Sequence, residues 1–204
     1  MRISCKICRR LGISICGREK CAFKRKPYAP GEHGRTRKFS RASSEFGTQL
    51  KEKQKLKFLY NLRERQFRNY IREAEKRTGD SGENLMRFLE ARLDNAIYRL
   101  GFAQTRTQAR QAVVHGHLMV NGRRVNIPSF RVKKNDKITI KQQSLSKGIF
   151  RDLDIYLKKY APPPWLSLDK EKKEGAVLSS PEMENNLLLG SNINLKAIIE
   201  FYSR

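Results

Sequence analysis

The chain has 204 residues, of which 38% are hydrophobic and 31% are charged, and its formal net charge is +24. This length is enough for one large domain or two modest ones, and the charge indicates a polyanionic partner, because Lys and Arg beside phosphates release condensed counterions. An anionic membrane is the alternative, but the sequence has neither a basic amphipathic helix with a broad apolar face nor about 18 apolar residues in a row, so nucleic acid is favoured.

The positive charge is concentrated in the first three quarters of the chain. Residues 1–78 hold 23 Lys and Arg against 7 Asp and Glu, and residues 79–160 hold 16 against 7. Residues 161–204 hold 5 against 6, so we expect this tail to pack against protein instead. The one apolar stretch near the start, residues 11–16, is too short for a secretory signal. We therefore expect a soluble protein of a reducing compartment, the cytoplasm or, as the alternative, an organelle.

Residues 1–45 contain all four cysteines and show no sustained helical or alternating period, which predicts irregular structure. Cys5, Cys8, Cys16 and Cys21 follow the spacing C-x2-C-x7-C-x4-C, which is typical of a tetrahedral site with four thiolate ligands. A closed shell of this kind leaves no position for water, so the site is expected to be structural. Zinc is favoured as the single ion.

Three alternatives to a four-cysteine zinc site remain at this point. An iron–sulfur cluster uses the same ligands, and four reduced cysteines without metal would also be compatible with the spacing. His33 could replace one cysteine as a metal ligand. A single histidine in a loop flanked by glycines is, however, more typical of a surface residue or an RNA contact. In each case the segment presents cations expected to contact RNA, namely Arg9, Arg10, Lys24, Arg25, Lys26, Arg35, Arg37 and Lys38, together with Tyr28.

Residues 46–77 have a strongly helical composition, and the pair Asn61 and Glu64 resembles a capping box, which predicts a break into two helices. On the second helix an apolar stripe is predicted at residues 67, 70, 71 and 74. A solvated charged face is the alternative to RNA contact here, but cations outnumber acids. The candidate contacts of this segment are Lys53, Lys57, Arg63, Arg68 and Arg72.

The middle of the chain predicts two helices followed by a small sheet. One amphipathic helix is expected from residue 85 to Gly101, and Thr105 with Gln108 predicts the cap of a second helix that Gly116 closes. Strands are expected on both sides of Asn121 and Gly122, with residues 125 and 127 on the returning strand, and again at residues 138–141.

The last part of the chain predicts one further helix at residues 146–160, terminated by three prolines, then an extended excursion and a buried strand at residues 197–202. The fold class expected is α+β. We predict a metal knot and basic arm at residues 1–45, a helical RNA-binding domain at residues 46–91 that residues 161–204 complete, and a small α+β RNA-binding module at residues 92–160.

Several strings together are similar to the family of small-subunit ribosomal protein four, of the bacterial type with cysteines, and the likeness covers nearly the whole chain. They are residues 28–34 (YAPGEHG), 49–60 (QLKEKQKLKFLY), 64–70 (ERQFRNY), 89–111 (LEARLDNAIYRLGFAQTRTQARQ), 115–129 (HGHLMVNGRRVNIPS) and 200–204 (EFYSR).

The resemblance implies a structural constituent of the small ribosomal subunit. It implies early binding at a multi-helix junction in the 5′ domain of the ribosomal RNA, and a later position beside the mRNA entry channel with neighbouring ribosomal proteins, especially number five. Carried over by position, the module's RNA contacts would be Arg92, Arg106, Gln108, Arg110, His115, His117, Asn121 and Arg123, to which the adjacent Arg124 is added from its charge.

Two other functions compete with this interpretation. The module is shared with RNA-modifying enzymes, and Arg92-Leu93-Asp94 resembles their catalytic string, but Asp94 falls inside a predicted helix and no second domain of catalytic size remains. A free-standing RNA-binding regulator would need only the module, whereas this chain adds a basic helical domain and a cysteine knot. We therefore expect no enzymatic activity and no small-molecule substrate.

Overall fold

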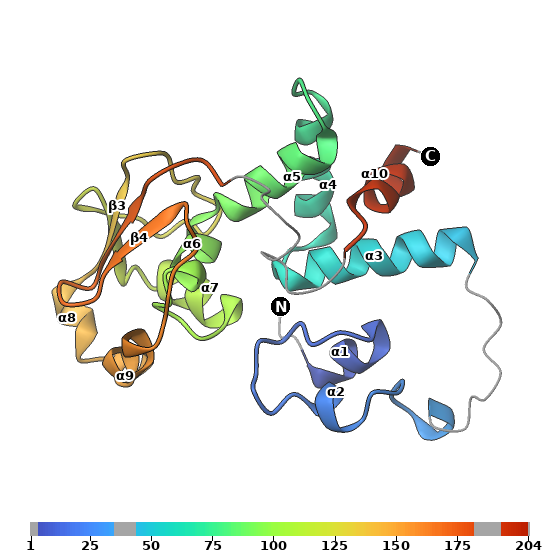
Figure 1. Cartoon of the computed structure of the whole chain (residues 1–204), viewed down its shortest axis with the longest axis horizontal. Helices are drawn as coiled ribbons and strands as arrows, with labels where there is room; N and C mark the ends of the chain where they lie inside the picture. The colour runs from blue at the N-terminus through green and yellow to red at the C-terminus, as the bar shows by residue number, and fades with distance from the viewer. Residues whose placement is uncertain (1–3, 35–43, 182–192, 204) are drawn as a thin grey trace. The chain divides into compact units, whose positions relative to one another are not determined.

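The structure is a computed structural model that describes residues 4–34, 44–181 and 193–203. The chain divides into two compact units, one made of residues 1–85 and 184–204 and the other of residues 86–183. In the described ranges the first unit is helical and the second combines helices with a sheet (Figure 1). None of the helices described is long and apolar enough to cross a membrane.

The N-terminal segment is more regular than the sequence predicts. It contains the helices α1 (Cys5–Leu11) and α2 (Ala22–Arg25) and the 3-10 helix η1 (Glu32–Gly34). Gly12 ends α1 with φ of 74°, and its N–H donates to the Cys8 carbonyl at 2.9 Å. The prediction of irregular structure was wrong here, because helices of four to seven residues are too short to show a period.

The predicted break after residue 60 is confirmed, since α3 (Glu45–Leu59) and α4 (Glu64–Glu75) are separate helices. The predicted cap is wrong: Arg63 is the N-cap of α4, and its N–H donates to Gln66 Oε1 at 3.4 Å. Asn61 instead makes the turn itself, with a φ of 53° that Asn tolerates better than most residues. The apolar stripe of α4 is buried as expected.

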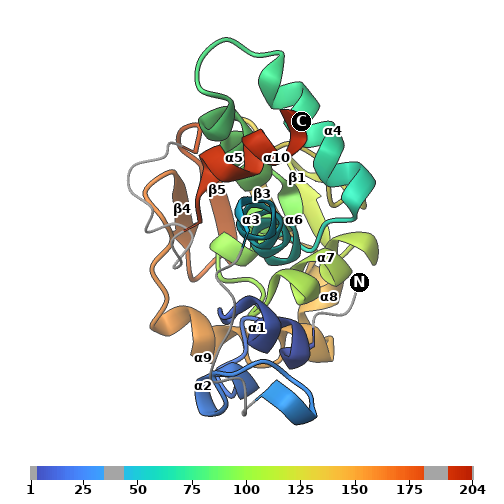
Figure 2. The ribbon, with the colours of Figure 1, turned by 90° about the vertical axis from the view of Figure 1, so that its right-hand side faces the viewer.

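The end of the chain is a helix and not the predicted strand. α10 (Leu195–Ser203) packs on α3 and α4 (Figure 2). The side chain of Asn194 accepts a hydrogen bond from the Ala197 N–H at 3.1 Å. A short apolar run does not distinguish a strand from a buried helix, and the capping role of Asn194 was the signal that distinguishes them here.

The helix predicted from residue 85 to Gly101 is two helices, α5 (Ser81–Glu90) and α6 (Leu93–Arg99). Arg92 is extended between them, with φ −67° and ψ 139°, and forms an isolated bridge with Arg131. The apolar period continues through this break, so the pattern contains no sign of it. The start of α7 (Arg106–Val114) is confirmed, because Thr105 Oγ1 accepts from the Gln108 N–H at 3.2 Å.

The second unit contains a five-stranded antiparallel sheet in the order β2-β1-β3-β5-β4. The predicted strands β1 (Leu118–Val120) and β3 (Lys137–Ile140) are confirmed, as is the turn, where Asn121 and Gly122 both have positive φ. The returning strand β2 (Arg123–Arg124) is shorter than predicted, and Ile127 lies beyond it, 56% exposed.

Residues 142–177 differ from the expectation in two ways. In place of the single helix expected at residues 146–160 are the 3-10 helix η2 (Gly148–Phe150) and α9 (Leu153–Lys158), and a short helix that was not expected, α8 (Gln142–Leu145), precedes them. The excursion after the prolines is a hairpin, β4 (Leu166–Asp169) and β5 (Glu174–Val177), and β5 pairs with β3. Residues 161–181 therefore lie in the second unit, although the sequence predicts that they complete the helical domain.

The core of the second unit lies between α6, α7 and the sheet. Its fully buried residues come from each of these elements, for example Leu93 and Ile97 of α6, Val113 of α7, Leu118 of β1 and Ile138 of β3. The predicted α+β class is confirmed, with the small module built on this core.

Candidate nucleic-acid interface and cysteine cluster

Three of the four cysteines of the N-terminal segment gather as their spacing predicts. The sulfur atoms of Cys5, Cys16 and Cys21 lie within 4.8 Å of one another, which is close enough for them to hold one metal ion. Cys8 is fully buried one helical turn after Cys5, and its thiol shares a hydrogen bond with that of Cys16. His33 is exposed on η1 and is not one of the three clustered groups.

The surroundings of the sulfurs favour the thiol form at Cys8 and Cys16 and the thiolate form at Cys21. Burial raises the pKa of Cys8 and raises the pKa of Cys16 to about 12. Burial acts in the same direction on Cys21, but hydrogen bonds from the Ser14 side chain and the Phe23 backbone outweigh it and lower its pKa to about 7. Backbone groups that hydrogen-bond to sulfur are common around metal–thiolate centres, so the donor set fits a soft cation such as zinc.

Among the cations near the cysteines, Arg9 has an internal partner. Its Nε and Nη2 donate to the carbonyls of Tyr28 and Ala29 at 3.0 and 3.1 Å, and its guanidinium lies 4.7 Å from the centre of the Tyr28 ring. Arg9 and Tyr28 therefore hold the loop after α2 in place. The remaining candidates of this segment, Arg10, Lys24, Arg25, Lys26 and His33, are exposed, and Arg35, Arg37 and Lys38 lie outside the described residues.

Two residues of the helical unit that were expected to contact RNA pair with the carboxylate of Glu64 instead. Lys53 is buried with its Nζ 2.8 Å from Glu64, and Lys57 lies 2.7 Å from the second oxygen of Glu64. Tyr202 of α10 donates to the same carboxylate. These partners lower the pKa of Glu64 to about 2, against the opposing effect of its partial burial. Arg63, Arg68 and Arg72 are exposed.

Arg92 is also turned inward. It is 1% exposed, and its Nε and Nη2 donate to Asp94 Oδ1 and Oδ2 at 3.0 and 2.7 Å. A direct contact between this side chain and RNA does not fit its burial, because a buried guanidinium needs its carboxylate partner. The resemblance implied that Arg92 contacts RNA, whereas Arg92 and Asp94 pair with each other in the interior.

The same network extends to the helix α7 that follows. Arg106 Nε donates to Asn95 Oδ1 at 2.8 Å and its guanidinium lies 4.4 Å from the centre of the Tyr98 ring, while Arg110 Nη1 is 4.0 Å from Asp94. Both arginines are partly exposed, so each guanidinium remains accessible at the surface while its contacts hold it in one position.

A concentration of cations surrounds the turn after α7. His115, Arg123 and Arg124 are exposed, and the rings of His115 and His117 stack with centres 5.8 Å apart. Burial lowers the pKa of His117, and the charges of Lys147, His115, Arg124 and Lys141 lower it further. Sequence reasoning missed Lys141 and Lys147, since neither belongs to a recognisable motif.

Two other candidates of the module serve the fold directly. Asn121 donates to Asp136 at 2.8 Å and accepts from the Lys137 N–H at 2.9 Å, which fixes the hairpin. Gln108 accepts from the Gln104 N–H at 3.1 Å and donates to the Ile149 carbonyl at 3.3 Å.

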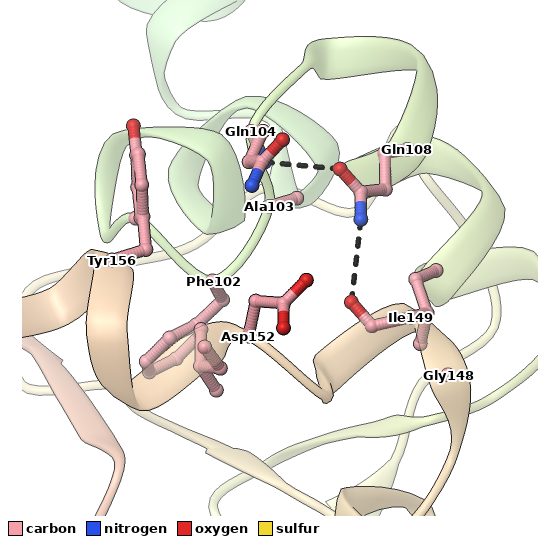
Figure 3. A pocket seen from close by; sticks show the side chains of 10 residues that line it. Phe102, Ala103, Gln104, Gln108, Gly148, Ile149, Asp152 and Tyr156 are labelled. Carbon is pink, nitrogen blue, oxygen red and sulfur yellow. Dashed lines mark hydrogen bonds between the residues drawn. The ribbon is translucent and has the colours of Figure 1, made fainter.

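A pocket of about 130 Å³ opens beside Gln108 (Figure 3). Its lining comes from the α6–α7 loop and from η2 and α9, and includes Phe102, Gln104, Ile149, Asp152 and Tyr156. Sequence reasoning missed this pocket, because its lining residues come from two distant segments of the chain and carry no motif.

Comparison with known proteins places these features in a family. Residues 2–90 match the model of the ribosomal protein S4/S9 N-terminal domain, and residues 91–138 match the S4 domain. The two matches meet between α5 and α6.

Curated relatives align over almost their whole length. The small ribosomal subunit protein uS4 of Thermus thermophilus is 45% identical over 206 residues, and that of Halothermothrix orenii is 44% identical. The uS4 protein of Geobacillus sp. strain WCH70 is 49% identical over 199 residues. Each alignment covers 98% of this chain and 96% of the relative. The chain therefore belongs to the uS4 family of small ribosomal subunit proteins.

Proposed function

We propose that this chain, by its family a structural and non-enzymatic constituent of the small ribosomal subunit, is a primary binder of the subunit's ribosomal RNA. Its binding to a junction in the 5′ domain would nucleate assembly of the subunit body. In the finished subunit it would sit in the cytoplasmic ribosome beside the mRNA entry region, next to other ribosomal proteins such as number five, and contribute to translational accuracy. The observation that supports this role most directly is the full-length kinship with uS4 proteins.

The charge of the exposed side chains supports the RNA part of the proposal. Each unit carries exposed arginines, on α4 in the first and on β2 in the second. Such side chains give affinity through phosphate contacts, which orient a protein on folded RNA. The proposed contacts are Arg10, Lys24, Arg25, Lys26, His33, Arg63, Arg68, Arg72, Arg106, Arg110, His115, His117, Arg123 and Arg124, with Arg35, Arg37 and Lys38 proposed from their charge alone.

Zinc is the proposed occupant of the cysteine cluster, with Cys5, Cys16 and Cys21 as three ligands and Cys8 as the fourth. A cation bound there would favour the thiolate form of all four side chains. It would also link α1, the following loop and α2, a segment with little apolar core of its own, since metal binding of this kind contributes roughly 10 kcal/mol or more to folding. The role of the ion is then structural.

Binding of the purified full-length chain to small-subunit ribosomal RNA tests the function. We expect tight binding to a transcript of the 5′ domain and co-sedimentation of the native protein with small subunits. Replacing Arg123 and Arg124 together by Gln should weaken binding to this transcript about tenfold or more without lowering the unfolding midpoint, because both side chains are exposed. Equal affinity for the 5′ domain and for an unrelated structured RNA would contradict the proposal.

A further inference from the structure

The pocket beside α9 contains polar groups that have no partner within the part of the chain that the structure describes. Asp152 is the N-cap residue of α9, yet its side chain makes no capping hydrogen bond. Figure 3 shows its carboxylate rising into the centre of the pocket instead, between Tyr156 and Gln108, with the side-chain amide of Gln104 above it. The Gln104 amide likewise has no partner among the described residues, since only the backbone N–H of this residue is engaged.

The walls of the pocket are suited to a flat ring. Tyr156 stands at one side, stacked on Tyr160 with ring centres 5.5 Å apart, and Phe102 and Leu153 belong to the buried core beneath. The cavity measures about 130 Å³, and a cavity of about 150 Å³ is known to accept benzene. The pocket therefore has room for one six-membered ring.

The polar groups restrict which ring can bind. An ionised carboxylate only accepts hydrogen bonds, whereas the amide of Gln104 can both donate and accept. Cytosine offers an amino donor at N4 for a carboxylate, with acceptors beside it for an amide donor. Uracil carries an oxygen acceptor at position 4, which the Asp152 carboxylate would repel.

A basic side chain of a neighbouring protein is the competing ligand for an unpaired carboxylate. Three observations favour a base. The pocket has an aromatic wall, the amide of Gln104 offers a donor that a guanidinium or ammonium group cannot use, and Lys147 and Arg151 flank the pocket-lining residues in sequence, where they suit the phosphates on either side of an extruded base.

We propose that this pocket binds one unpaired pyrimidine of an RNA strand and selects cytosine, with Asp152 accepting from N4, Gln104 donating to the ring acceptors and Tyr156 contacting the ring. The site rests on the proposed RNA-binding function and adds base selection to it. Phosphate contacts elsewhere on the chain supply affinity but do not distinguish sequences.

Fluorescence anisotropy with labelled hexaribonucleotides tests the site on the full-length protein. We expect the oligomer of cytidine to bind about tenfold more tightly than the oligomer of uridine. This ratio lies in the lower part of the range of discrimination that one good contact with a base edge provides. Asp152→Ala should reduce this preference to less than twofold. Tyr156→Leu should weaken binding of both oligomers, because base–aromatic contacts contribute to affinity for every base.

Asp154→Ala is the matched control, because Asp154 lies on α9, is exposed and pairs with Lys173 at 2.9 Å, and its loss changes the net charge equally. This variant should keep the preference for cytidine. Equal binding of the two oligomers by the unmodified protein, or a preference that survives Asp152→Ala, overturns the assignment. Binding that depends on Asp152 but is found only with an arginine-containing peptide also overturns it and identifies a protein partner. In each of these cases, retained affinity for the 5′-domain transcript shows that the proposed function itself stands.

Discussion

The charged residues Arg92 and Asp94 are nearly inaccessible to solvent, at 1% and 5% exposure, and each depends on the other. Two hydrogen bonds join them, and Arg110 lies 4.0 Å from the same carboxylate. Nearby, Glu90 receives two hydrogen bonds from Arg99, at 3.0 and 2.9 Å, and one from Asn95. These pairs fix the short link between α5 and α6, where the helical hydrogen bonding is interrupted.

Replacing Asp94 by Ala should destabilise the second unit by about 3 kcal/mol or more, because it leaves the Arg92 guanidinium buried without a carboxylate. The midpoint and slope of urea unfolding measure the loss. Asp154→Ala serves as the control, since its exposed pair with Lys173 contributes at most about 1 kcal/mol. If Asp94→Ala leaves stability unchanged and instead removes an RNA-modifying activity, the structural interpretation of this pair is wrong.

At the scale of elements, Glu64 joins three helices of the first unit. Lys53 and Lys57 of α3 and Tyr202 of α10 all donate to its carboxylate at the start of α4. The pKa of Glu64 is lowered from 4.5 to about 2 in the folded chain. Its contribution to stability is therefore fully present above about pH 4.5 and is lost as the pH falls toward 2.

Glu64→Gln should lower the stability of the first unit by about 1–2 kcal/mol at pH 6, an amount that allows for the partial exposure of this carboxylate. At pH 3 the difference between the variant and the unmodified protein should be smaller, because Glu64 of the unfolded chain, with its pKa near 4.5, is then mostly protonated and the unfolded state is stabilised. Chemical unfolding at the two pH values measures both differences. The exposed Glu75 of the same helix is the control, and Glu75→Gln is expected to change stability by less than about 0.5 kcal/mol.

We expect a metal ion bound by the cysteines to stabilise the folded segment that contains α1 and α2. We expect elemental analysis to find one zinc per chain, and dialysis against a strong chelator to make residues 4–34 sensitive to proteases. The urea unfolding of the second unit should not change, because no cysteine lies in it. Visible absorbance by the purified protein would identify an iron–sulfur cluster instead, and unchanged metal content and protease resistance after chelation would exclude a structural ion.

Three features with a local signal in the sequence were predicted correctly. The cap at Thr105, the Asn121–Gly122 turn and the stripe of α4 depend on residues close together in the chain, and all three are confirmed. The break between α5 and α6 and the helix α10 were missed. The break depends on a contact with a distant residue, the hydrogen bond from the Leu93 N–H to the Phe130 carbonyl at 2.8 Å. Helix α10 combines packing on the distant α3 with a local cap at Asn194 that sequence reasoning did not use.

The candidate sites show the same difference between features with a local sequence signal and features that depend on distant residues. Cysteine spacing placed Cys5, Cys16 and Cys21 together, because a site of this kind is built within a short segment. Charge alone could not show that Lys53 and Arg92 face inward, since no pattern in the sequence pairs them with Glu64 and Asp94. The pocket around Asp152 was missed because two segments far apart in sequence form it.

At the scale of the whole molecule, the exposed cations behind the net charge of +24 make RNA binding sensitive to salt. The logarithm of the affinity should fall linearly with the logarithm of the salt concentration, with a slope that counts the neutralised phosphates at about 0.7–0.9 each. We expect more than three phosphates from the exposed cations of the two units. A smaller number would mean that the basic faces do not contact the backbone of the RNA.

Paired substitutions show which part of the chain supplies these contacts. Arg68→Gln with Arg72→Gln removes two exposed cations of α4, and should lower the slope by about 1.5 while leaving the unfolding midpoint unchanged. Lys172→Gln with Lys196→Gln removes the same charge from residues 161–204, where acids outnumber bases, and should leave the slope unchanged. Equal effects of the two pairs would mean that affinity follows total charge and not the placement of cations, and the assignment of α4 to the RNA interface would then be wrong.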